Sequence, residues 1–351
     1  MVVSVILFIL IFGILVTTHE LGHFLIAKAN NIRVLEFMIG MGPAIFKKQK
    51  GETLYCLRLI PFGGACRFEG EDDIDGDDQG YDERSFPNAN VWARIAVLFA
   101  GPVFNFITAM ILAVIVVANS PWAFPVISGI TEEDSAAAEA GLQEGDLIVK
   151  VDGEKIHLAS EVTLISQFSK GGVMHIDYER DGQMGHTELT PHYSEEDDRY
   201  YMGIYLGKYE NVKGPKILAY AWYDVLYYFK STYRCLALLV QGRLSLGDVS
   251  GPVGMVKIVD DTYEAVSPYG ISSVVLTMLE LLILLSVNLG VMNLLPFPAL
   301  DGGRLVFSFI EVLRGKPVPR EKEGMVHLVG MVILMAFMVV VVISDVSKFM
   351  K

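Results

Sequence analysis

The chain is poor in cysteine and in basic charge. Its 351 residues include three cysteines, Cys56, Cys66 and Cys235, and no two of them form a CxxC pair. We therefore expect neither a disulfide framework nor a cysteine-ligated zinc site. The formal net charge is −13. Because no basic stripe is available to follow a phosphate backbone, the composition argues against nucleic acid as a partner.

Charge is also missing from long stretches of the chain. Hydrophobic residues make up 52% of the sequence, the mean hydropathy is +0.43, and Val2–Thr18 and Ile95–Thr131 contain no charged residue. Runs of about 20 apolar residues match a bilayer core of roughly 30 Å. The sequence therefore predicts a polytopic α-helical membrane protein with four transmembrane helices, at about 2–26, 93–118, 276–298 and 324–344.

The first apolar run has no basic segment before it and no small-residue cleavage site after it, so we expect a retained span and not a signal peptide. Lysine and arginine predict the orientation, because they concentrate in cytoplasmic loops. Residues 28–90 carry eight of them, and the loop after the third span carries more. Both loops should be cytoplasmic, and the termini and the long polar insert should be extracytoplasmic.

The insert at about 125–207 contains VISGI, AGLQEGDLIVKVDGEKI and VMHIDYERDG. These segments indicate a small α/β domain, and their order resembles a PDZ domain, which would bind a peptide by strand addition. A plain spacer is the alternative.

The expected domains are 1–120 (membrane core), 125–207 (PDZ domain), 208–270 (interfacial helix and linker) and 271–351 (membrane core). Residues 216–241 are apolar, but charges in mid-segment favour an interfacial helix over a fifth span.

The end of the first span reads GILVTTHELGHFLIAKA, an unusual place for two histidines and a glutamate. His19 and His23 are four residues apart and share one helix face, so both imidazoles can bind one metal ion such as zinc. Glu20 lies beside the pair, where it can take a proton from a water molecule that the metal activates. The alternative is a packed structural cluster, which is costly at this depth.

A catalytic zinc usually has three protein ligands. The third span ends NLGVMNLLPFPALDGGRL, and we expect Asp301 to supply the third ligand because both spans reach the same half of the bilayer. Pro296 and Pro298 break the helix before it. Asn293 and Asn288 can hydrogen-bond the freed backbone or a substrate, and contacts between helices are their alternative role.

Together, HELGH and NLLPFPALDGG resemble the site-2 protease family of intramembrane zinc metalloproteases, most closely its bacterial RseP-type regulators of sigma-factor signalling. IPFGGACRFEGED, FAGPVFNF and SGPVGM agree with this resemblance. It implies one Zn²⁺ held by His19, His23 and Asp301, with Glu20 as the catalytic base and Asn293 near the substrate. The chain has room for a single PDZ domain.

Residues 53–68 are expected to form two short strands around a Pro-Phe-Gly-Gly turn, a membrane-associated β-hairpin whose edge pairs with an unwound substrate. Gly63 and Gly64 of this hairpin, and Pro296 at the broken end of the third span, are candidate substrate-binding residues. Asn105, after the helix-kinking Pro102, either lines a water path or serves packing. The acidic run at 71–82 is expected to be a solvated loop and not a calcium site.

We therefore expect an intramembrane zinc endopeptidase in the bacterial plasma membrane. It would cut single-pass membrane substrates, anti-sigma factors or signal-peptide remnants by the resemblance, after a first extracytoplasmic cut. The lipid bilayer is its other expected partner, and a peptide bound to the PDZ domain is a further candidate. The alternatives are a non-catalytic, metal-stabilised PDZ binding protein and, less favoured, a metal transporter.

Overall fold

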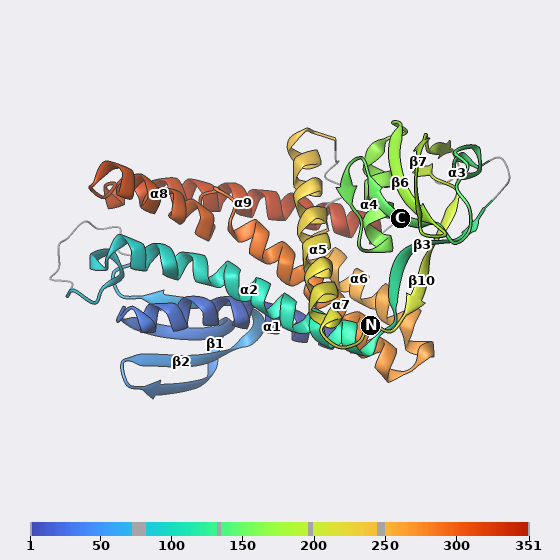
Figure 1. Cartoon of the computed structure of the whole chain (residues 1–351). Helices are drawn as coiled ribbons and strands as arrows, with labels where there is room; N and C mark the ends of the chain where they lie inside the picture. Colours follow the sequence, from blue (N-terminus) through green and yellow to red (C-terminus); the bar gives the residue numbers. More distant parts are fainter. Residues whose placement is uncertain (1, 72–81, 132–134, 196–198, 244–249, 350–351) are drawn as a thin grey trace. The chain divides into compact units, whose positions relative to one another are not determined.

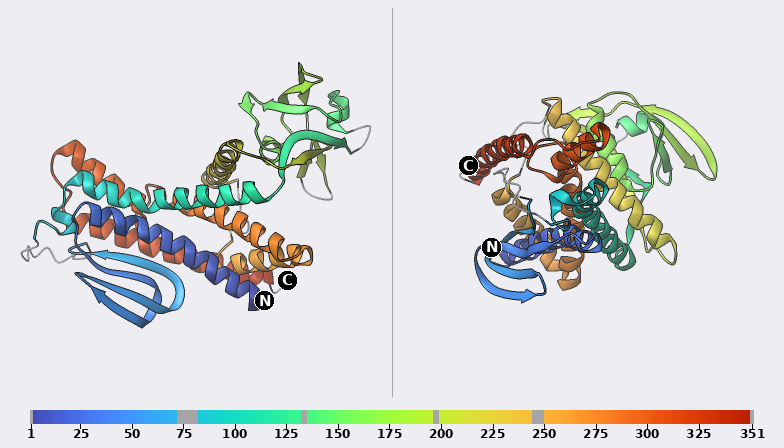
Figure 2. Two further views of the ribbon diagram at one scale, coloured as in Figure 1. Left: turned by 60° about the horizontal axis from the view of Figure 1, so that its bottom comes forward. Right: turned by 90° about the vertical axis from the view of Figure 1, so that its left-hand side faces the viewer.

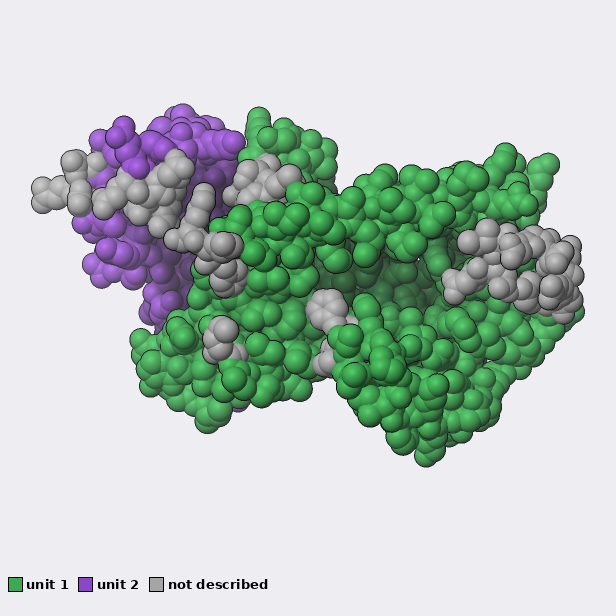
Figure 3. All heavy atoms as spheres, turned by 180° about the vertical axis from the view of Figure 1, so that it is seen from behind, with its two compact units in different colours: residues 1–112, 232–351 green, residues 113–231 purple. Residues whose placement is uncertain are grey.

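A computed structural model describes residues 2–71, 82–131, 135–195, 199–243 and 250–349 (Figure 1). The chain divides into two compact units, which Figure 3 distinguishes by colour. Unit 1 comprises residues 1–112 and 232–351, and unit 2 comprises residues 113–231. Most of the acidic run, residues 72–81, lies outside the described residues.

Four helices of the described chain are long and apolar enough to cross a membrane: α1 (Val2–Ala29), α2 (Val91–Asn119), α7 (Ile271–Asn293) and α9 (Arg320–Phe349). The predicted four-span membrane protein is confirmed. The predicted third span of 276–298 is displaced, because α7 ends at Asn293. Pro296 and Pro298 have no backbone N–H to donate. The chain runs irregularly through them before α8 (Asp301–Arg314) begins. The fifth apolar segment forms α5 (Lys216–Val240), which is not among the four.

The membrane-associated hairpin is larger than predicted, and its strands pair differently. It consists of β1 (Val34–Lys50) and β2 (Thr53–Phe68), joined at Gly51–Glu52. The two halves of 53–68 do not pair with each other: Leu54–Leu57 and Gly64–Phe68 both pair with the first part of β1. The expected pair of short strands within 53–68 is therefore wrong. The hairpin lies beside α1 (Figure 2).

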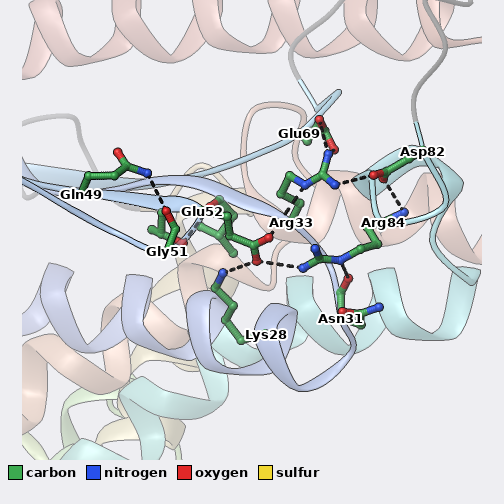
Figure 4. Close-up of polar contacts among 11 residues, drawn as sticks. Lys28, Asn31, Arg33, Gln49, Gly51, Glu52, Glu69, Asp82 and Arg84 are labelled. Carbon is green, nitrogen blue, oxygen red and sulfur yellow. Dashed lines mark hydrogen bonds and ion pairs between the residues drawn. The ribbon is translucent and has the colours of Figure 1, made fainter.

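A network of charges fixes the base of this hairpin (Figure 4). Glu52 at its turn accepts hydrogen bonds from Lys28 Nζ at 2.6 Å and from an Arg84 guanidinium nitrogen at 2.8 Å. Arg33 binds both carboxylate oxygens of Glu69, at 2.7 and 2.8 Å, and also contacts Asp82. The hydrogen bonds from Arg84 and Lys28 lower the pKa of Glu52 from 4.5 to about 2. The network joins the end of α1, the hairpin and the segment that leads through a short 3-10 helix (Phe86–Asn88) to α2.

Helix α6 (Pro252–Val266) begins within the SGPVGM stretch, and a 3-10 turn (Ser267–Tyr269) links it to α7. A residue of α9 caps the start of α6. The buried Asp345 accepts hydrogen bonds from the backbone N–H groups of Gly251 at 2.9 Å and Gly254 at 2.8 Å. A Cβ at either glycine would approach the Asp345 carboxylate within 3.0 Å. The glycines thus allow a close contact that satisfies amides at the start of α6.

Unit 2 contains an antiparallel sheet with strand order β10-β3-β4-β6-β7, and β5 pairs with β4. Ile127, Leu142, Ile148, Met174 and Ile176 are central members of its apolar core. The predicted inserted α/β domain is therefore confirmed. Its elements are β3 (Trp122–Ile130), α3 (Ala136–Glu139), β4 (Leu147–Val151), β5 (Glu154–Lys155), α4 (Ala159–Ser169), β6 (Met174–Arg180), β7 (Gln183–Leu189), β8 (His192–Ser194), β9 (Arg199–Tyr201) and β10 (Ile204–Glu210).

Candidate metal centre

The two histidines of α1 face one point. Their Nε2 atoms lie 3.1 Å apart, and their rings meet edge to face with centroids 4.7 Å apart. Both side chains are buried, each with 7% of its surface exposed. The i, i+4 spacing therefore produces the shared face that the sequence predicts.

Asp301 joins this pair as the first residue of α8. Its Oδ2 atom lies 3.1 Å from His19 Nε2 and 3.3 Å from His23 Nε2. Among the described residues these three form the one group whose ligand atoms meet closely enough to hold a metal ion. Gly302 and Gly303 permit the tight entry into α8, because a Cβ on either would lie within 2.4 Å of a backbone oxygen of the preceding loop.

The chemistry of these three atoms fits a zinc ion. His23 Nδ1 lies 2.8 Å from the Val97 carbonyl oxygen and must donate to it, so in the neutral ring that binds metal the lone pair is on Nε2. Asp301 Oδ2 is buried and accepts no hydrogen bond from the described residues. Acceptors packed together without a donor repel each other unless a cation lies among them. A tetrahedral site with zinc–ligand bonds of about 2.0–2.1 Å has ligand–ligand edges of about 3.3 Å, close to the distances found.

Glu20 follows His19 in α1 and faces the hairpin. A Cβ at Gly64 would lie 3.3 Å from Glu20 Cγ and 2.9 Å from a methyl carbon of Val16. The absence of a side chain at Gly64 therefore lets β2 approach the carboxylate.

The structure places the predicted substrate-binding residues at different distances from this cluster. Asn293 Nδ2 lies 3.4 Å from His19 Nε2 at the end of α7. Asn288 accepts a hydrogen bond from Thr232 of α5. Asn105 is fully buried, and its side-chain amide lies 3.1 Å from His19 Nδ1. Pro296 lies in the loop before Asp301.

Gly63 is bent, with φ of +80°, and a Cβ there would lie 2.6 Å from the Met41 methyl group. This turn carries the chain from the first half of β2 to the second half, which contains Gly64 and contacts α1. Gly63 therefore shapes the hairpin.

Gly101 of α2 is a site residue that the sequence reasoning missed. A Cβ at this position would lie 2.3 Å from His23 Nε2 and 2.7 Å from His19 Cε1. The FAGPVFNF stretch was noted, but only the three-dimensional contact reveals that its glycine provides space for both rings. Helix α2 thus leaves space for both rings at Gly101. It also makes one polar contact to each ring, from Val97 to His23 and from Asn105 to His19.

Known proteins resemble this chain over most of its length. The family model described as peptidase family M50 matches residues 7–337. The chain belongs to this family. The regulator of sigma-W protease RasP of Bacillus subtilis is 32% identical, over 98% of this chain and 98% of its own. The zinc metalloprotease RasP of Geobacillus kaustophilus is 31% identical, over 99% and 98%. Among solved structures, PDZ domains of SdrC-like proteins from Listeria monocytogenes and Listeria innocua each align with 25% of this chain, at 21% and 20% identity and TM-scores of 0.21 and 0.23.

Membership of the M50 family makes this chain an intramembrane zinc metalloprotease of the site-2 type. Zinc is accordingly the cofactor, and the predicted enzyme class is confirmed. The non-catalytic alternative is not favoured.

Proposed function

We propose that His19, His23 and Asp301 hold one zinc ion per chain and that Glu20 is the general base of peptide hydrolysis. The observation that carries this proposal is the meeting of Asp301 Oδ2 with two imidazole nitrogens at 3.1 and 3.3 Å. At least two of these atoms have only lone pairs to offer, and a cation is the partner that satisfies them.

The surroundings of His19 support the same ligand role. Thr18 Oγ1 donates its single proton to the Leu15 carbonyl oxygen at 3.0 Å, so it can only accept from Asn105, 3.5 Å away. As placed, Asn105 Oδ1 faces Thr18 and Nδ2 faces His19 Nδ1. Because the oxygen and nitrogen of an amide can be exchanged by a flip, we assign the flipped amide, whose NH₂ group donates to Thr18 and whose carbonyl oxygen accepts from His19 Nδ1–H. In this arrangement the His19 Nε2 lone pair is free to bind metal, as in His23.

Zinc and two side chains near it would have separate roles in peptide hydrolysis. Bound zinc supplies a Lewis acid that polarises the scissile carbonyl. Glu20 takes a proton from the attacking water and passes it to the leaving amine. Asn293, next to His19, is placed to hydrogen-bond the substrate backbone. A peptide held here must first be unwound, because a membrane helix hydrogen-bonds its own backbone.

The second half of β2 is the proposed docking edge for the unwound peptide. Gly64–Phe68 pairs with β1 and lies beside Glu20 of α1. An extended substrate that adds to this edge would bring its peptide bonds to the metal cluster by main-chain hydrogen bonds.

The proposed substrates are single-pass membrane proteins, anti-sigma factors or signal-peptide remnants, in the plasma membrane of a bacterium. Two features support this: the chain's relative in Bacillus subtilis is named as a regulator of sigma-W protease, and basic residues concentrate in the loops assigned to the cytoplasm. The active site would then lie toward the cytoplasmic half, and the termini and the insert would be extracytoplasmic.

The insert is proposed to be a PDZ domain that binds a peptide. It has a cavity of about 630 Å³ beside the edge strand β10, lined among others by Ser166, Gln167 and Tyr205. Helix α5 is proposed to lie at the membrane surface, with Leu218, Trp222 and Phe229 among its exposed apolar residues. Both assignments concern how a substrate is selected or held, and neither changes the proposed chemistry.

Reconstitution into vesicles with a single-pass substrate tests the proposed function. The wild type should cleave within the transmembrane segment, and Glu20→Gln should retain about one zinc per chain without cleaving. A suitable control is Leu10→Ala, at a half-exposed position of the same helix, which should cleave normally. Cleavage by Glu20→Gln at the wild-type rate would contradict the role of Glu20 as base.

A further inference from the structure

The loop that delivers Asp301 contains a strained residue. Ala299 has φ of +80°, a region that alanine rarely adopts because its Cβ crowds the backbone. Such a conformation persists only where surrounding contacts impose it. The residue lies two positions before Asp301, so its conformation helps to determine where the carboxylate is placed.

Helix α9 supplies the contact that imposes this conformation. The Ala299 backbone N–H donates to His327 Nδ1 at 3.0 Å. One turn further along the same face of α9 lies Gly330, where a Cβ would come within 2.4 Å of Pro298 Cβ and 2.6 Å of the Pro298 oxygen. Two neighbouring positions of α9 therefore contact the two residues that precede Leu300.

Helix α9 makes few other buried contacts. Within its described part, the buried residues are Gly330, Val341 and Asp345. Asp345 is the cap of α6, far along the helix from His327. Of these described buried residues, Gly330 packs on the loop before Asp301, whereas Val341 and Asp345 pack at the start of α6, and His327 is the polar group beside Gly330.

The hydrogen bond also determines the state of the His327 ring. Because Nδ1 accepts from Ala299, the neutral ring carries its proton on Nε2. Nε2 has no hydrogen-bond partner among the described residues, and the nearest carboxylate, Glu323 on the same helix, lies 4.0 Å away. The ring is packed against Phe307 of α8, with centroids 5.5 Å apart. His327 is thus held between α8 and the loop by one directed bond.

We propose that His327 is a positioning residue for the metal centre, which fixes Asp301 through its hydrogen bond to Ala299. This inference rests on the proposed role of Asp301 as a ligand. It adds that the third ligand depends on α9, which carries none of the ligands itself. Removal of the acceptor would let Ala299 relax toward negative φ and displace the carboxylate from the two imidazoles.

Two substitutions distinguish this bond from a mere packing role. His327→Asn keeps an acceptor, because Oδ1 of asparagine is attached at Cγ as Nδ1 is in histidine. His327→Leu keeps apolar bulk and removes the acceptor. Leu328→Ala, at a half-exposed neighbouring position of α9, is the matched control. A fourth variant adds Ala299→Gly to His327→Leu, because glycine adopts positive φ without strain.

The experiment measures zinc affinity by competition with a chelator and the visible spectrum of the cobalt-substituted full-length protein in detergent. We expect about tenfold weaker zinc binding and an altered cobalt spectrum for His327→Leu, near-wild-type values for His327→Asn and Leu328→Ala, and partial recovery in the double variant. Thermal unfolding of each variant checks that the fold is intact. If His327→Leu does not fold, His327→Asn decides the question. A folded His327→Asn protein that binds zinc about tenfold more weakly than the wild type would then overturn the inference.

Two outcomes separate this inference from the proposed function. If the wild type itself bound no zinc, the proposed metal centre would be wrong. If the wild type bound zinc and folded His327→Leu gave the same affinity and the same cobalt spectrum, the positioning role of His327 would be wrong while the metal centre stood.

Discussion

Gly101 of α2 leaves the space that His23 occupies: a Cβ at this position would lie 2.3 Å from His23 Nε2. The same atom would lie 2.7 Å from His19 Cε1. Real Cβ atoms do not approach other atoms so closely, so any side chain at position 101 must displace the two rings or separate the helices. The proposed metal centre therefore depends on a residue that offers no ligand.

Gly101→Ala should abolish stoichiometric zinc binding and cleavage while the protein remains folded. Gly13→Ala is the control, because a Cβ there meets nothing within 4 Å, and alanine favours the helix. Metal analysis of both purified variants makes the comparison. Zinc bound by Gly101→Ala at the wild-type level would show that the rings do not need this space.

Asn105 should control zinc affinity through His19. Asn105→Leu removes the partner of Nδ1, and we expect about 10- to 100-fold weaker zinc binding, measured by chelator competition. Asn105→Asp keeps an acceptor for Nδ1–H and should bind zinc much more tightly than Asn105→Leu. Equal affinities for the two variants would exclude a hydrogen-bonding role.

The cap from Asp345 should contribute to stability and not to catalysis. Asp345→Ala leaves the Gly251 and Gly254 N–H groups without their acceptor, at an expected cost of about 1–3 kcal/mol. Thermal unfolding in detergent measures this loss, with Val346→Ala, a partly exposed position on α9, as the control. An unchanged unfolding midpoint for Asp345→Ala would refute the cap.

The ion pairs of Glu52 at the base of the hairpin should make the stability of the protein depend on pH (Figure 4). The pKa of Glu52 is lowered from 4.5 to about 2, so its stabilising effect is complete above pH 4.5 and is lost as the pH falls toward 2. Because Glu52 is partly exposed, we expect at most about 1 kcal/mol. The stability difference between the wild type and Glu52→Gln should therefore close over this range. A difference that stays constant from pH 7 to pH 2.5 would contradict the assignment.

The sequence predicted the spans and the ligand cluster because both follow local rules. Charge-free runs identify the membrane helices, and the spacing of His19 and His23 places two imidazoles on one helix face. Asp301 could be added because a catalytic zinc usually has a third protein ligand and the first and third spans reach the same half of the bilayer.

Contacts between segments distant in sequence were not predictable in this way. The turn signal at Pro61–Gly64 suggested a local hairpin, but the halves of β2 both pair with β1, a pairing that local patterns do not encode. The space at Gly101 and the bond from Ala299 to His327 likewise depend on which helices meet. A glycine or a membrane histidine has many possible roles until its neighbours are known.

Zinc content combined with X-ray absorption at the zinc edge tests the metal centre most directly. The account predicts about one zinc per chain in the wild type, with two imidazole nitrogens at about 2.0–2.1 Å, and loss of the metal in Asp301→Ala. A wild type without zinc, or an Asp301→Ala protein with unchanged zinc content and an unchanged absorption spectrum, would contradict it.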